Sequence, residues 1–150
     1  MGEMQVHHTA GVVIECNDRF VLIVRKFENL LDIPSGHVNE SGDIIESVLK
    51  HAKNETFIEL KPRELVELGE CEYIRGKDSG LPYVYGDHLH KVHLFFCRLE
   101  SLPPMIPGGD AKNIKLLTWE DALNSMDKMI GSAKGAFELL KQKRFKSRII

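Results

Sequence analysis

The stretch Ile33-Pro34-Ser35-Gly36-His37-Val38, followed by the run from Ile44 to Ile58, decides the fold of this chain. Pro34 and Gly36 favour a turn. In the run that follows, apolar residues recur at the three-four spacing of an amphipathic helix. A loop that leads into such a helix can present carboxylates to a metal ion, but only Glu55 remains where several acids would be needed. The stretch therefore indicates a fold more clearly than an activity.

Strands and helices alternate around this stretch. Residues 20–24 are all apolar, which is typical of a strand buried on both faces of a sheet. Asp43 or Ser41 can cap the helix that starts at Ile44. The patterns predict a mixed sheet sandwiched by helices, in the α/β (α+β) class. The expected strands are 6–16, 19–25, 63–75, 88–99 and 114–119, and 33–38 is expected to be a short strand or a turn. The expected helices are 44–56, about 132–146, and one turn that begins at Thr118 or Glu120 and runs through Leu123. The expected loops are 77–87 and 102–112.

Length and composition predict one domain, residues 1–150, of an ordinary water-soluble kind. The net charge of -2 argues against a general polyanion binder, so no strong nucleic-acid signal is expected. No apolar run approaches the roughly 18 residues of a membrane helix, and the first residues do not resemble a secretion signal. Cys16, Cys71 and Cys97 lie far apart in apolar segments, which indicates free thiols in a reducing cytoplasm. We expect a cytoplasmic monomer or homodimer.

From about residue 7 to residue 140, the order of these segments resembles the Nudix (MutT-like) superfamily. Residues 8–14 and 20–25 are similar to the family's opening hairpin, and residues 31–38 are similar to its Trp-x-Leu-Pro-Gly-Gly-x-Val motif. Residues 114–123 are similar to its late strand-Trp-helix element. The resemblance implies an α/β/α sandwich with a mixed sheet. It also implies a pyrophosphohydrolase of nucleoside diphosphates linked to another group, with Mg²⁺ or Mn²⁺ held by carboxylates of the box helix.

The family's box runs Gly, five residues, Glu, seven residues, Arg-Glu, an aliphatic, any residue, Glu-Glu, any residue, Gly, an aliphatic. Counted without gaps from Gly36, the box acids are mostly replaced, and the apolar positions persist. The chain has Gly42 for the first Glu, Lys50-His51 for Arg-Glu, Asn54-Glu55 for Glu-Glu and Phe57 for Gly. A one-residue insertion would place Asp43 at the first acid. The gap-free register is preferred because residues 54–58 then follow the family's helix end, and Glu55 is a box acid in both registers.

By this resemblance the candidate catalytic residues are Glu55, Lys50 and His51, and the candidate metal ligands are Glu55, His51 and Asp110. His51 lies one helical turn before Glu55, so the two could hold zinc or manganese, or form a helix-surface hydrogen bond. Lys50 replaces an Arg that orients a neighbouring Glu in the family, and as a point charge it faces either phosphate or solvent. Asp110 follows Gly108-Gly109 in a loop where relatives often carry another acid, although Gly-Gly-Asp is also an ordinary turn.

The candidate ligand-binding residues are Gly36 and His37 of the turn, with Tyr83 and Tyr85 of the 77–87 loop. Tyrosines in a loop can stack on a base, or they can pack against the edge of the sheet. His88 and His90 share one strand face and could converge on a ligand or simply be hydrogen-bonded, and His93 points to the other face. The partner we expect is a small nucleotide-like ligand.

Three functions follow. The first is a metal-dependent pyrophosphohydrolase that uses Glu55 and acids from outside the box, with Mg²⁺ or Mn²⁺ as cofactor. The second is a module that keeps the groove and binds a nucleotide or phosphate without turnover and without a cofactor, because one Glu poorly meets the electrostatic demand of phosphoryl transfer. The third is a divergent enzyme that uses the histidines around residues 88–93 for another metal or reaction. The sequence leaves open whether the protein is an enzyme.

Overall fold

A computed structural model describes residues 5–75 and 88–149, with no side-chain description for residues 145–149. Its strands are β1 (Gln5–Cys16), β2 (Arg19–Arg25), β3 (Leu31–Asp32), β4 (Ser35–His37), β5 (Val66–Arg75), β6 (His88–Arg98) and β7 (Ala111–Thr118). Its α-helices are α1 (Ile44–Thr56), α2 (Trp119–Asn124) and α3 (Gly131–Ile149), and short 3-10 helices occupy Pro62–Glu64 and Met126–Lys128. The predicted loop 77–87, with Tyr83 and Tyr85, lies outside the described residues.

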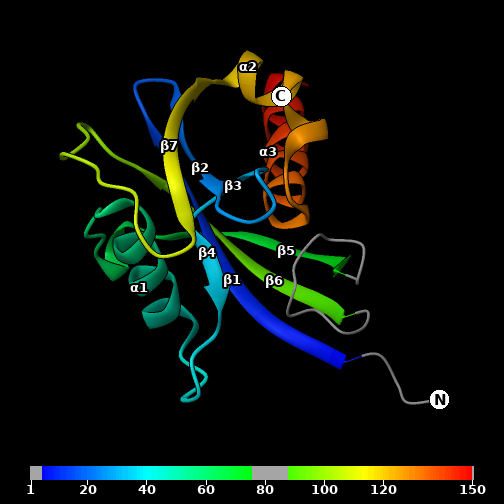
Figure 1. The fold of residues 1–150 in the computed structure, drawn as a ribbon. Coiled ribbons are helices and arrows are strands. Elements are labelled where there is room, and N and C mark those ends of the chain that lie inside the picture. Colours follow the sequence, from blue (N-terminus) through cyan, green and yellow to red (C-terminus); the bar gives the residue numbers. More distant parts are fainter. Residues whose placement is uncertain (1–4, 76–87, 150) are drawn as a thin grey trace.

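The strands form one mixed sheet between helices. Its main order is β3-β2-β1-β6-β5, with β4 paired to β1 and β7 paired to β2. Strands β1 and β6 pair in parallel from Gln5–His88 to Glu15–Arg98, and the other pairs of strands are antiparallel. Helix α1 lies on one side of the sheet and α3 on the other (Figure 1). The predicted fold class, a sandwich with a mixed sheet, is confirmed.

The sheet separates two apolar cores because side chains alternate across it. On β1, Val12 and Ile14 pack toward α1, and Val13 between them belongs to the core beneath α3. On β2, Phe20 and Leu22 join that second core. Residues 20–24 are thus buried on both faces, as their continuous apolar character predicts. Because β2 is buried on both faces, its register in the sheet is fixed, and so is the position of Arg25 at its end.

Helix α1 has the predicted bounds, 44–56, and Asp43 caps it by accepting a hydrogen bond from the Glu46 N–H at 3.0 Å. The helix ends at Phe57, which has a left-handed φ of 69° and donates its N–H to the Lys53 carbonyl. Glycine is the residue that normally fills this position. Phe57 stands where the gap-free box has its glycine, so the backbone geometry supports that register.

Some boundaries differ from the sequence-based prediction. Strand β7 begins at Ala111 rather than residue 114, because its ladder with β2 continues to the Arg25–Ala111 pair. In the segment 33–38, predicted as a short strand or a turn, only Ser35–His37 forms a strand, and β3 ends before it at Asp32. The Pro34 carbonyl between them instead accepts a hydrogen bond from the Val12 N–H at 3.0 Å. This hydrogen bond attaches the turn at Pro34, which lies beside the site, to β1 in the middle of the sheet.

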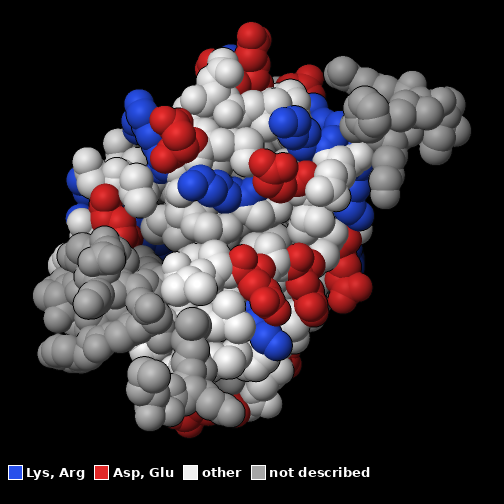
Figure 2. Space-filling model, turned by 90° about the vertical axis from the view of Figure 1, so that its right-hand side faces the viewer, with Lys and Arg blue, Asp and Glu red and all other residues white. Residues whose placement is uncertain are grey.

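On the face shown in Figure 2, basic and acidic side chains are interspersed, and the described residues form no broad area of one sign. This agrees with the small net charge of -2. Among the helices that the structure describes, none combines the length and apolar content required to cross a bilayer.

Replacing Phe57 with Gly should stabilise the protein. A non-glycine residue in the left-handed region is strained, and Phe57 is 57% exposed, so little packing is lost. We expect the free energy of unfolding to rise by about 1 kcal/mol in urea titrations. The matched control is Phe27→Gly, at a similarly exposed residue without a positive φ, which should give no gain. Equal effects of the two substitutions would contradict the strain at Phe57.

Candidate functional site

A polar pocket of about 200 Å³ lies where α1, the β3–β4 turn and the start of α3 meet the sheet. It brings together residues that are far apart in the sequence, from Thr9 to Ser132. Five of the predicted site residues line it: Gly36, His37, His51, Glu55 and Asp110.

Arg25, at the end of β2, organises the floor of this pocket. Its Nε and Nη2 contact Asp32 Oδ2 at 2.9 and 2.8 Å, and its Nη1 donates to Glu55 Oε2 at 3.0 Å. Its Nη2 also donates to the carbonyl oxygen and Oγ of Ser35 at 3.0 and 2.9 Å. Burial lowers the pKa of Arg25, but the Asp32 and Glu55 carboxylates more than offset this and raise it. Arg25 therefore remains a cation at every relevant pH.

Asp32 connects this cluster to α3, the helix on the opposite side of the sheet from α1. Its Oδ1 accepts hydrogen bonds from the Ile33 N–H at 2.8 Å and from Ser132 Oγ, near the start of α3, at 2.7 Å. Its Oδ2 accepts from Arg25 and, at 3.2 Å, from Ser35 Oγ. Asp32 and Ser132 are both almost fully buried. The cluster thus joins β2, β3, β4, α1 and α3 through satisfied polar groups, as buried charges require.

Both carboxylate oxygens of Glu55 are occupied by groups of the protein. Oε2 accepts from Arg25, and Oε1 accepts from the Ser35 backbone N–H at 2.9 Å. Burial raises the pKa of Glu55 to about 7, although Arg25 and the Ser35 N–H act in the opposite direction. Glu55 therefore holds the β3–β4 turn against α1.

His51 packs across the turn above Glu55. Its Nε2 donates to the His37 carbonyl at 2.7 Å, and burial is the main cause of a lowered pKa for its imidazole. A Cβ on Gly36 would lie 2.3–2.7 Å from the His51 ring, so only glycine permits this packing. His51 and Glu55 line the same pocket but bond to different partners, so the two do not act as a pair.

Asp110 reaches the pocket from the loop before β7. Gly108 lies so close to α1 that a Cβ there would be 2.6 Å from the Asn54 carbonyl oxygen. The Asp110 carbonyl accepts from the Lys26 N–H at 2.9 Å, and its carboxylate lies 3.9 Å from Arg25 Nη1. The carboxylate is 69% exposed, which makes it the accessible acid of this pocket.

Histidines gather beside the pocket because β1, β4 and β6 are neighbours in the sheet. The parallel register places His7 opposite His90, and the His7 and His37 rings share a hydrogen bond of 2.9 Å. The ring centroid of His7 lies 4.7 Å from that of His88 and 5.3 Å from that of His90. Burial, followed by the neighbouring His37 and His88, lowers the pKa of His7. His93 points to the other face of the sheet, as its position in the strand predicts. Its Nδ1 lies 3.1 Å from Glu70 Oε1.

Sequence reasoning missed the organising residues of this site, Arg25, Asp32 and Ser132. The available signal was a charge directly after the apolar run 20–24 and an acid directly before Ile33-Pro34. Of the predicted residues, Lys50 is exposed and is not part of the pocket lining, and Tyr83 and Tyr85 lie outside the described residues.

The family model for the NUDIX domain matches residues 6–139. This chain belongs to the NUDIX family. No curated protein matches it. The fold is similar to that of the MutT protein from Methanosarcina mazei Go1 (TM-score 0.75, 14% identity, 96% of this chain and 99% of that one). It is also similar to the NUDIX domain of Shewanella oneidensis NrtR complexed with ADP ribose (TM-score 0.68, 14% identity, 95% and 90%).

A third similar structure is a bifunctional NMN adenylyltransferase/ADP ribose pyrophosphatase from Francisella tularensis, complexed with AMP and a manganese ion (TM-score 0.70, 20% identity, 95% of this chain). The chain spans 43% of the length of that protein. At these identities the three likenesses establish the fold of this NUDIX domain.

The described residues do not fit a divalent-metal centre of the NUDIX box kind. Magnesium requires several oxygen ligands, but both oxygens of Glu55 and both oxygens of Asp32 already accept protein hydrogen bonds. His51 uses Nε2 on a carbonyl, which leaves Asp110 as the exposed acid. No group of three His, Cys, Asp or Glu side chains in the described part of the chain is arranged to hold a metal ion.

Glu55 should make stability fall as pH rises. Its carboxyl has a folded pKa of about 7, above the ordinary value of 4.5, so its contribution is complete below pH 4.5 and is lost as pH rises through 7. The free energy of unfolding of the wild type, relative to Glu55→Gln, should therefore fall as pH rises across this range. The wild type must be compared with Glu55→Gln because His7 and His51, whose pKa values are lowered, make the free energy of unfolding rise with pH in both proteins. A difference that rises with pH would contradict the raised pKa.

Proposed function

We propose that this NUDIX domain binds a nucleoside diphosphate-type ligand at the pocket around Arg25 and Glu55, and that it does not hydrolyse the ligand. The proposal rests on one observation: Arg25 and the Ser35 N–H occupy both oxygens of Glu55, the one box acid that the chain keeps. A guanidinium in contact with the carboxylate supplies the positive charge that a metal would otherwise supply there. Removing one member of such a buried pair typically costs about 3–5 kcal/mol, which opposes its displacement by a metal ion.

The pocket volume and lining support a phosphate-bearing ligand. About 200 Å³ accommodates a phosphate group, with the rest of the ligand outside. Beside the Arg25 guanidinium, the lining includes the polar side chains of Thr9, His37 and His51. Two structural relatives hold AMP or ADP ribose, which supports the same chemical class for this domain.

The second candidate function is divalent-metal-dependent pyrophosphate hydrolysis. The observation that favours it is the exposed Asp110 carboxylate, which faces the same pocket as Glu55 and lies 3.9 Å from Arg25 Nη1. If a ligand displaced Arg25, Glu55 and Asp110 could together provide oxygen ligands for Mg²⁺ or Mn²⁺.

Binding and turnover can be separated with ADP-ribose, dinucleoside polyphosphates and nucleotide sugars. We expect at least one compound to raise the melting temperature in EDTA, and none to release product with Mg²⁺, Mn²⁺ or Zn²⁺. Glu55→Ala should weaken binding, because the β3–β4 turn loses its anchor to α1. The matched control is Glu46→Ala, at an exposed acid in the first turn of the same helix, which should bind normally.

Metal-dependent turnover that is lost in Glu55→Ala and Asp110→Asn, but kept in Glu46→Ala, would overturn the binding-only function and support the hydrolase. Asp110→Asn is informative because that side chain is exposed and its loss should leave the fold intact. If no compound of this class stabilises the protein or is hydrolysed, both functions are wrong.

A further inference from the structure

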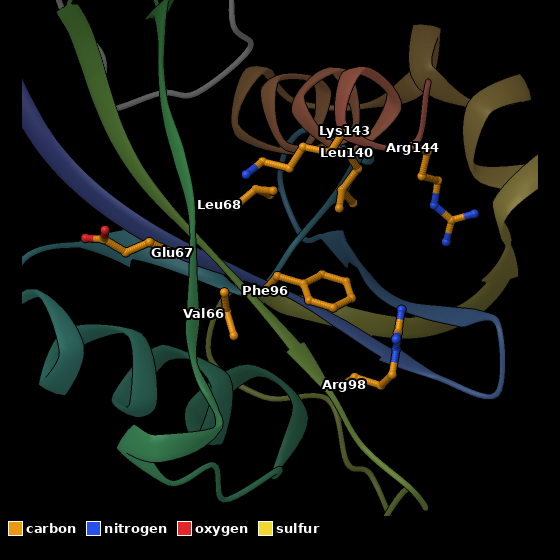
Figure 3. A pocket seen from close by; sticks show the side chains of 8 residues that line it. All are labelled: Val66, Glu67, Leu68, Phe96, Arg98, Leu140, Lys143 and Arg144. Carbon is orange, nitrogen blue, oxygen red and sulfur yellow. The ribbon is translucent and has the colours of Figure 1, made fainter. Parts of the chain in front are cut away.

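A second cavity of about 440 Å³ lies between α3 and the ends of β5 and β6. It shares no lining residue with the pocket around Arg25. Figure 3 shows α3 above this groove and the two strands beneath it. Its volume falls within the range of about 300–1,000 Å³ that is usual for small-molecule sites.

One end of the groove carries two arginines held by a buried carboxylate. Glu15, 1% exposed, accepts from Arg98 Nε at 2.6 Å and from Arg144 Nη2 at 3.2 Å. The guanidinium of Arg144 also lies 4.1 Å from the ring centroid of Trp119, a cation–π contact that fixes it further. Each guanidinium has five N–H donors, so both retain donors for an incoming acceptor. Their side chains are 70% and 36% exposed.

The floor of the groove is apolar and partly uncovered. Leu68 and Leu140 are almost buried, and Phe96 is partly buried beside them. Val66 is 60% exposed, at the open side. In Figure 3 these side chains lie between the arginines and the more distant Lys143. An apolar surface next to fixed guanidinium groups is complementary to a molecule with an apolar body and one anionic end.

We propose that this groove binds a medium-chain aliphatic carboxylate. The carboxylate contacts Arg98 and Arg144, and the chain lies over Val66, Leu68 and Phe96. The cations of the groove are Arg98, Arg144 and Lys143, and its anions are Glu15 and Glu67. One net positive charge remains, which a carboxylate monoanion matches and a phosphate dianion exceeds. The planar fork of arginine also suits a carboxylate geometrically.

Octanoate is the probe, and the only tryptophan of the chain, Trp119, is the reporter because Arg144 lies against its ring. We expect saturable fluorescence changes with a dissociation constant on the order of 0.1 mM, checked by calorimetry. Octanol should bind at least tenfold more weakly, since it lacks the charge that strengthens hydrogen bonds to guanidinium, and octyl phosphate should bind no more tightly than octanoate.

Two variants test where octanoate binds. Val66→Asp places a negative charge on the exposed floor and should weaken binding at least tenfold. Ile74→Asp is the matched control, since it lies on the same strand, is also 60% exposed and is not part of the groove. Arg98→Gln should weaken binding tenfold or more, and circular dichroism checks that each variant is folded.

Equal binding of octanol would overturn the carboxylate assignment, and tighter binding of octyl phosphate would overturn the monoanion assignment. The absence of saturable binding at millimolar octanoate would overturn the site, as would equal losses in Val66→Asp and Ile74→Asp. Because the groove and the Arg25 pocket share no residue, these outcomes are independent of the nucleotide-binding function.

Discussion

The buried guanidinium of Arg25 is the constraint on which the candidate site depends. It contacts Asp32, Ser35 and Glu55, and through Asp32 it reaches Ser132 of α3. Both helix layers and the β3–β4 turn are therefore fixed relative to β2 by one charged cluster. Burying these charges is costly, and the cluster is tolerated because nearly every donor and acceptor in it has a partner.

This constraint changes what Glu55 can do. A box carboxylate that bound a metal would need free oxygens directed at the ion, but the oxygens of Glu55 hold Arg25 and the Ser35 N–H. On the same helix, His51 bonds to the His37 carbonyl, and residue 54 is an asparagine without a carboxylate. The NUDIX fold is thus held by packing around α1, and the Glu55 end of that helix is joined to β2 by the contact with Arg25.

The fold could be predicted because its signals are local and periodic. The helix 44–56 follows from the apolar spacing and the Asp43 cap, and the buried strand follows from five consecutive apolar residues, 20–24. The site could be predicted only in part. Glu55 and Asp110 were predicted from the family resemblance, but Arg25 and Asp32 have partners as far along the chain as Asp110 and Ser132, which the fold assembles. No local sequence pattern predicts such contacts.

The most direct test of the Arg25–Glu55 pairing is a titration of the wild-type protein with Mn²⁺, followed by calorimetry and by the electron paramagnetic resonance of free Mn²⁺. If Arg25 holds Glu55, binding at this pocket should be weak, with a dissociation constant on the order of 1 mM or above, and it should be unchanged by Glu55→Gln. A micromolar site that disappears in Glu55→Gln would show that the carboxylate is free to bind metal. That result would contradict an Arg25–Glu55 pair that keeps the carboxylate from binding metal.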